Sequence, residues 1–217
     1  MKQILISLSR IATCLTLFLM SLNSIAFAEG LEERWGIGLR LGPSFLVEKL
    51  SDKTEGETGL IINGTISYGL TNKVLAGLHV EWEEHTIKDR SSDFIYGEET
   101  TVSIIPTIEL HPRGGSPFSP YGLLGVGINL NSFRASNDLN ASCAPCNVEP
   151  KNTLAVKGGV GIDYFMTPNL VYNGELDLKM NDGTSDLSGN IPGFTSGTSS
   201  DNSACVLSLI FGARYYY

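Results

Sequence analysis

Apolar and polar residues alternate along most of the chain after about residue 30. In residues 170–181 the even positions are mainly apolar, while the odd positions carry Glu175, Asp177 and Lys179. The same parity recurs at 154–164 and at 122–130. Because successive side chains of a β-strand point to opposite faces, a period of two predicts strands with one apolar and one polar face.

The alternating runs predict eight strands. Their expected bounds are 34–46, 59–70, 73–86, 98–111, 119–133, 152–166, 169–181 and 203–217. The connections between them then have 12, 2, 11, 7, 18, 2 and 21 residues, so that long loops and short turns alternate. An up-and-down arrangement follows, with the short turns at one end and the long loops at the other.

Helices are not expected after residue 30, since no segment there keeps an apolar stripe of helical spacing without Gly or Pro. Proline is the main objection to the strand interpretation. Pro106 falls in the middle of an expected strand, where its missing N–H removes a hydrogen bond of the ladder. We therefore expect a bulge or a register irregularity at Pro106.

The first 28 residues have the pattern of an export signal. Lys2 supplies a positive start, residues 4–22 are mostly apolar, and Ala26, Phe27 and Ala28 match the small-x-small cleavage pattern. An N-terminal membrane anchor is the alternative. We expect a signal peptide over 1–28 and one β-barrel domain over 29–217.

Composition narrows the class of protein further. The 217 residues include 15 basic and 23 acidic side chains, a formal net charge of −8, which argues against binding to nucleic acid. Residues 4–28 are the one long apolar stretch, so a protein with several membrane helices is excluded.

A soluble barrel and a membrane barrel share this periodicity but place the apolar face differently. The export signal, the alternation of long loops with tight turns and the last strand favour the membrane barrel, whose apolar face meets lipid. In the last strand Phe211, Tyr215 and Tyr217 lie on one face, in a pattern similar to the C-terminal assembly signal of outer-membrane barrels. The expected fold class is all-β, an eight-stranded antiparallel up-and-down transmembrane β-barrel.

Three segments resemble one family of such barrels. They are SPYGLLGVGIN at 119–129, GGVGIDYFMTPNLVYNGELDLKMN at 158–181 and the Pro–Thr pair at 106–107. In them the chain resembles the small bacterial outer-membrane β-barrels typified by outer membrane proteins A, X and W, most closely the W type. The resemblance implies an outer-membrane location. W-type barrels are associated with the passage of small hydrophobic compounds through an apolar lumen.

With the apolar face outward, the lumen of this barrel is charged. The residues expected to line it are Arg40, Glu81, Glu83, Glu109, Lys157, Asp163, Glu175, Asp177, Lys179 and Arg214. Since side chains fill an eight-stranded lumen and an unpaired charge there is costly, we expect a paired network that blocks the bore. A three-residue turn that pairs Phe165 with Asn169 would place Lys157 opposite Asp177.

Histidines and carboxylates of the chain are candidates for chemistry. His79, Glu81, Glu83 and His85 share an inward face, where a metal site or an acid–base set is conceivable, but a satisfied polar network is the preferred interpretation. His111, beside a short turn, is expected to be solvated. No catalytic residue, cofactor or metal is assigned.

Two of the long loops carry features of their own. Cys143 and Cys146 form a CxxC, interpreted as a structural disulfide of an exported loop, with a redox-active pair as the alternative. Residues 182–202 include Asp182, Asp186 and Asp201, for which calcium or saccharide contact is possible, although a solvated loop is preferred.

The sequence thus predicts a monomeric outer-membrane barrel that is not an enzyme, with both termini in the periplasm and four loops outside. Its expected role is membrane structure or surface interaction through the loops. The alternative is a W-like narrow pore or lateral conduit for small hydrophobic molecules. Expected partners are outer-membrane lipid, lipopolysaccharide and, during biogenesis, the barrel-assembly machinery.

Overall fold

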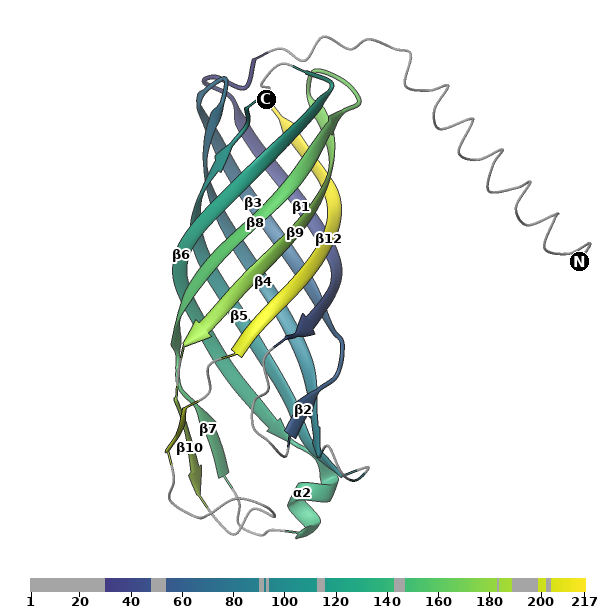
Figure 1. The fold of residues 1–217 in the computed structure, drawn as a ribbon, viewed down its shortest axis with the longest axis vertical. Helices are drawn as coiled ribbons and strands as arrows, with labels where there is room; N and C mark the ends of the chain where they lie inside the picture. The colour runs from purple at the N-terminus through teal and green to yellow at the C-terminus, as the bar shows by residue number, and fades with distance from the viewer. Residues whose placement is uncertain are drawn as a thin grey trace, which may run out of the picture.

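The computed structural model describes residues 30–47, 54–89, 92, 94–112, 116–142, 147–182, 184–188, 199–201 and 204–217. The strands form an upright barrel with tilted walls (Figure 1). The predicted signal peptide and the cysteine pair Cys143 and Cys146 lie outside the described residues, so both stay predictions.

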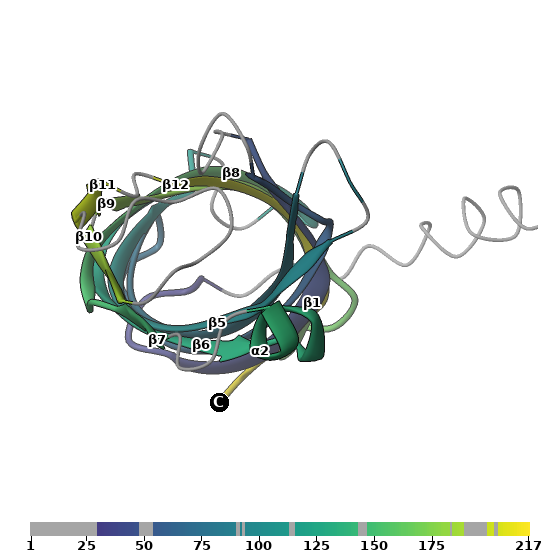
Figure 2. The same ribbon diagram turned by 90° about the horizontal axis from the view of Figure 1, so that it is seen from below.

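Eight long strands form the wall, which confirms the predicted fold class. They are β1 (Trp35–Leu46), β3 (Gly59–Thr71), β4 (Val74–Asp89), β5 (Ile95–Leu110), β6 (Phe118–Ala135), β8 (Thr153–Phe165), β9 (Leu170–Asp182) and β12 (Ala204–Tyr216). Every neighbouring pair is antiparallel, and β1 pairs with β12. The sheet therefore closes on itself, as the view along the axis shows (Figure 2).

The two ends of the barrel differ. The end that holds Trp35, Tyr216 and the short connections is called the turn end below, and the opposite end the loop end. The loop end carries the small elements β2 (Thr54–Gly56), α2 (Asn137–Ser142), β7 (Asn147–Pro150), β10 (Thr184–Ser188) and β11 (Ser199–Asp201). The expectation of no helix was wrong for α2, a six-residue helix in a loop. Within the described ranges, no helix is long and apolar enough to cross a membrane.

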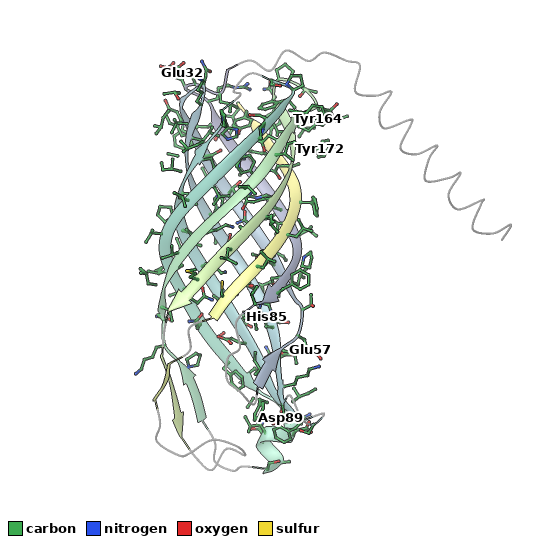
Figure 3. All side chains as sticks on the ribbon, viewed as in Figure 1. Glu32, Glu57, His85, Asp89, Tyr164 and Tyr172 are labelled. Carbon is green, nitrogen blue, oxygen red and sulfur yellow. The ribbon has the colours of Figure 1, made fainter. Side chains whose placement is uncertain are left out.

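Alternation in the strands sorts the side chains between the two faces of the wall. Large apolar side chains of all eight strands are exposed on the outside, for example Leu39, Leu124, Val160 and Phe211. At the turn end the outer face carries aromatic rings, including Tyr164 and Tyr172 (Figure 3) and the neighbouring rings of Trp35 and Tyr68, 5.0 Å apart.

The apolar band has the height of a bilayer core. On β12 it runs from Tyr215 to Cys205, which is ten residue-to-residue steps. At about 3.3 Å per residue and a tilt of about 40°, this spans about 25 Å. Beyond the band at the loop end, the outward positions of the wall carry charge, as at Glu84, Glu98 and Arg134. We therefore treat β4 from residue 83 onward and β5 up to residue 101 as projecting beyond the band.

Two predictions of register were wrong. At Pro106 the register is unchanged: Leu78 pairs with Pro106, and the β5–β6 ladder resumes in the same register at Thr107. Since the ladder toward β6 lacks only the pairs at residues 105 and 106, proline is accommodated without an inserted residue. The register shifts lie between Gly69 and Thr71 and between Ile87 and Lys88.

The second error concerns the β8–β9 hairpin. Its turn covers residues 166–169, and Phe165 pairs with Val171 rather than with Asn169. This register is two residues from the predicted one, so Lys157 lies opposite Lys179. A shift of two keeps every side chain on its predicted face.

Candidate functional site

The lumen is lined by charged side chains that are shielded from solvent. All ten charged residues expected there are at most 2% exposed: Arg40, Glu81, Glu83, Glu109, Lys157, Asp163, Glu175, Asp177, Lys179 and Arg214. Four are basic and six are acidic. Burial of so many charges is tolerable only where they pair and form hydrogen bonds.

The side chains of two lysines form ion pairs in the middle of the lumen. The Lys157 ammonium lies 2.5 Å from a Glu81 oxygen, 3.2 Å from Glu175 and 3.2 Å from Asp177. The contact between Lys157 and Asp177 therefore forms diagonally, although the two residues are not opposite each other. Lys179 lies 2.7 Å from a Glu83 oxygen and donates to Ser103 at 3.0 Å.

Arg40 connects several walls of the lumen. Its guanidinium pairs with Glu175 and donates to the amide oxygen of Asn63 at 3.0 and 3.2 Å. It also reaches the Tyr121 hydroxyl at 3.4 Å, and that hydroxyl donates to Glu175 at 2.8 Å. Asn63 donates in turn to Glu81 at 2.7 Å, so the arginine and lysine clusters are continuous.

Arg214 and Glu109 form a two-pronged pair nearer the turn end. Both terminal nitrogens of the guanidinium donate to the carboxylate, at 2.7 and 2.9 Å. One of them also donates to the Tyr216 hydroxyl at 2.9 Å. The rings of His79 and His111 lie 3.5 and 3.3 Å from the same carboxylate.

His111 is not solvated, contrary to the prediction. Its side chain is fully buried, its Nδ1 lies 3.2 Å from Ser119 Oγ, and its ring stacks on Tyr121 with 5.1 Å between ring centres. The backbone N–H of His111 donates to Lys73 O at 2.7 Å, which continues β5 by one residue. Its side chain therefore falls on the same inward face as Glu109.

These contacts cross the full width of the bore. Around the closed sheet, β9 lies four places from β4, β12 four from β5, and β1 four from β6. In a ring of eight strands, four places means the opposite wall. Lys179–Glu83, Arg214–Glu109 and Arg40–Tyr121 join these three pairs of opposite strands.

Inward glycines make room for the large side chains. A Cβ added at Gly161 would lie 2.3 Å from the Tyr121 ring, and one at Gly36 would lie 2.8 Å from the Tyr216 ring. Each glycine is the direct cross-strand partner of its tyrosine. The predictions from sequence did not include these glycines, although their inward parity next to large residues is a readable signal.

An apolar cluster closes the turn end of the lumen. It consists of Leu31, Leu75, Phe165, Val171 and Tyr216, all at most 2% exposed. Leu31 comes from the segment before β1, which is held to β3 by the hydrogen bond from Glu33 N to Gly69 O, 2.8 Å. These apolar side chains face inward, against the simple rule of a polar lumen.

At the loop end, His85 connects the wall to the chain that follows β2. Its Nε2 lies 2.8 Å from Glu83, and its Nδ1 lies 3.0 Å from Glu57 O (Figure 3 labels His85 and Glu57). Burial lowers the pKa of His85, but the hydrogen bond and the charge of Glu83 more than offset this, so its pKa is raised. Glu99, its partner on β5, has a pKa raised mainly by burial.

A second apolar cluster lies at the loop end. Ile87, Tyr96 and Leu139 are buried together, with Phe133 and Leu46 among the side chains packed against them. Leu139 belongs to α2, so the cluster fixes this helix to the projecting parts of β4 and β5. The Tyr96 hydroxyl donates to Asp89 at 3.1 Å; burial and this contact raise the pKa of Tyr96 to about 12.

The four residues of β4 that are candidates for a metal or acid–base set are engaged in other contacts. His79 contacts Arg40, Glu81 contacts the two lysines, and Glu83 contacts Lys179 and His85. In the part of the chain that the structure describes, no three His, Cys, Asp or Glu side chains are placed to hold a metal ion. The acidic side chains of loop 182–202 lie outside the described ones.

The fold and the lumen together define a class: this chain has the fold of the small eight-stranded outer-membrane β-barrels. A scan against protein-family models and a search of curated proteins gave no match. Among solved structures it is similar to the outer membrane protein OprG from Pseudomonas aeruginosa, with 16% identity and a TM-score of 0.62 over 87% of this chain and 99% of OprG.

Two further structures are similar to the chain. The outer membrane protein AlkL, solved in lipid bilayers, has 16% identity and a TM-score of 0.57 over 88% of this chain and 92% of AlkL. Ail of Yersinia pestis, in complex with the heparin analogue sucrose octasulfate, has 16% identity and a TM-score of 0.51 over 86% of this chain and 99% of Ail. At these identities the likeness establishes the fold.

Proposed function

We propose that this chain is an outer-membrane β-barrel with an occluded bore, which acts without enzymatic chemistry as a structural or surface-interacting component of the bacterial envelope. The observation that carries the occlusion is the set of contacts between opposite strands, Lys179–Glu83, Arg214–Glu109 and Arg40–Tyr121. A solute crossing the bore would have to break these buried ion pairs and the Arg40–Tyr121 hydrogen bond as it passes.

The outer surface supports the membrane part of this proposal. Apolar side chains encircle the barrel over a height of about 25 Å, and every wall strand is paired on both sides within that band. No barrel edge is left there for a second chain, which supports a monomer among lipid and lipopolysaccharide. The last strand, with Phe211, Tyr215 and Tyr217 outward, is the expected contact of the barrel-assembly machinery.

The surface role is assigned to the loop end. There β7 and β10 join two separate long connections into one small sheet, and Leu139 fixes α2 to the projecting wall. Such elements add structure that spanning a bilayer does not require. The chain's acidic balance argues against a polyanionic ligand of the kind bound to Ail in its crystal structure.

Solute entry into liposomes tests the occlusion. Liposomes containing the refolded protein should take up small sugars no faster than protein-free liposomes, whereas faster uptake would contradict an occluded bore. Uptake of a small hydrophobic solute, measured in parallel, would favour a lateral conduit instead.

Replacing residues 183–203 with a short turn tests the surface role. The barrel should still fold, because wall strand β9 ends at Asp182 and wall strand β12 begins at Ala204, so no wall residue is replaced. Cells carrying this variant should lose any surface phenotype of the wild type. A phenotype that is kept by this variant and lost on disruption of the barrel would assign the function to the wall.

A further inference from the structure

Three oxygen-bearing side chains lie side by side near the turn end of the lumen. Ser119 on β6 pairs with Asp163 on β8, and Asp163 pairs with Asn173 on β9. All three face inward and are buried, with 0%, 0% and 7% exposure. Directly paired residues have Cα atoms about 4.5–5.5 Å apart, so Ser119 and Asn173 both flank the Asp163 carboxylate.

Three of the side-chain oxygens in this row lack protein partners. Both carboxylate oxygens of Asp163 and the amide oxygen of Asn173 accept no hydrogen bond from the residues that the structure describes. Ser119 Oγ is held by His111 Nδ1 at 3.2 Å, which leaves it an oxygen lone pair. Buried groups of this kind call for a bound water or ion.

Asp163 also lacks a direct ion-pair partner. The guanidinium of Arg214, on β12 two strands away, attracts this carboxylate at longer range but donates from both terminal nitrogens to Glu109 and from one of them also to Tyr216. Within the described ranges no cationic side chain lies within 4 Å of Asp163, whereas Asp177, further along the lumen, has Lys157 at 3.2 Å. A buried carboxylate without a counter-charge is too costly to stay ionised.

The apolar cluster seals the row from the turn end. Phe165 and Val171 are the next inward positions after Asp163 and Asn173, and they pair with each other. An ion in this row would be shielded from bulk solvent on that side.

We propose that Ser119, Asp163 and Asn173 form a binding site for a monovalent hard cation such as Na⁺. Oxygen ligands select hard cations over transition metals. One carboxylate with two neutral oxygens balances a single positive charge, whereas Ca²⁺ sites use more carboxylates and six to eight oxygens. The ion supplies a positive charge in direct contact with Asp163, which no described side chain supplies.

Unfolding of the refolded full chain in NaCl and in choline chloride of equal ionic strength tests the site. Choline is too large to enter the row. The wild type should melt about 3 °C higher in about 0.1 M NaCl, if that concentration is roughly ten times the dissociation constant. In Asp163→Asn the difference should vanish.

Asp177→Asn is the matched control, since it removes a buried carboxylate that already has a lysine partner. It should keep the sodium effect. Equal melting of the wild type in both salts would overturn the proposal and indicate that Asp163 carries a proton. A sodium effect of equal size in Asp163→Asn would overturn it too, because the ion would then bind elsewhere.

A crystal soaked in thallium(I), a heavy substitute for monovalent cations, gives an independent readout. The anomalous map should show a peak in contact with the Asp163 carboxylate in the wild type and none there in Asp163→Asn. A map without this peak in the wild type would contradict the proposal, even if the variant fails to fold.

Discussion

The pair Arg214–Glu109 offers a quantitative test of the lumen network, through the variant Arg214→Met. The closest contact between the two charged groups is 2.7 Å, and the side chains are 0% and 1% exposed. At an effective dielectric constant of about 20, two unit charges at this distance attract by about 6 kcal/mol. Desolvation of both groups offsets most of this gain, so the net value of the pair is small.

Removal of only one partner of the pair lowers the stability much more. Arg214→Met leaves the Glu109 carboxylate buried beside an apolar side chain, which should lower the free energy of unfolding by about 3–5 kcal/mol. The double variant Glu109→Leu with Arg214→Met buries no unpaired charge and should recover most of this loss. The matched control is Arg134→Met, because the Arg134–Glu98 contact is 3.5 Å and exposed. It should cost less than about 1 kcal/mol.

Urea unfolding in detergent micelles, followed by tryptophan fluorescence, provides the assay. Trp35 is 48% exposed on the outer face, so its emission reports on the transfer from micelle to water. A loss of unfolding free energy in Arg214→Met no larger than in Arg134→Met, or a double variant as unstable as the single one, would refute a buried Arg214–Glu109 pair.

Three further predictions concern the apolar cluster at the turn end, the packing around Tyr121 and the loop end. Leu31→Ala should lower the free energy of unfolding by about 2–4 kcal/mol in the same assay, because Leu31 is fully buried; an unchanged value would mean that the segment before β1 does not seal the lumen. Gly161→Ala should slow refolding and destabilise the barrel, since its Cβ would lie 2.3 Å from the Tyr121 ring, while Gly158→Ala, whose nearest contact is 3.5 Å, should not; equal effects would exclude this packing. The pKa of His85 is raised in the folded protein, so its stabilisation is complete below about pH 6.5 and is lost as the pH rises through the folded value. The free energy of unfolding of the wild type should therefore fall as the pH rises through this range, and that of His85→Gln should change less. Parallel curves for the two proteins would refute the raised pKa of His85.

The inward or outward direction of each side chain in the strands could be predicted from the sequence, because side chains alternate with a period of two. A register error of two residues leaves every side chain on the same face. Lys157 illustrates both sides of this point. Its inward direction followed from parity, whereas its cross-strand partner depended on the length of the turn at 166–169, which parity does not determine.

Contacts across the lumen could not be predicted, because they join residues far apart in the chain. The pairing of Arg214 with Glu109 depends on the closed order of the strands, and the space for Tyr121 depends on Gly161 in the next strand. His111 was misjudged because its position beside a turn was given more weight than the parity that it shares with Glu109. The small loop elements are too short to produce a periodic signal.

Conductance of single barrels in a planar lipid bilayer tests the central claim most directly. The inserted wild-type protein should leave the bilayer at its baseline current, because side chains from opposite walls meet across the bore. Stable, unitary current steps from the wild type would contradict it.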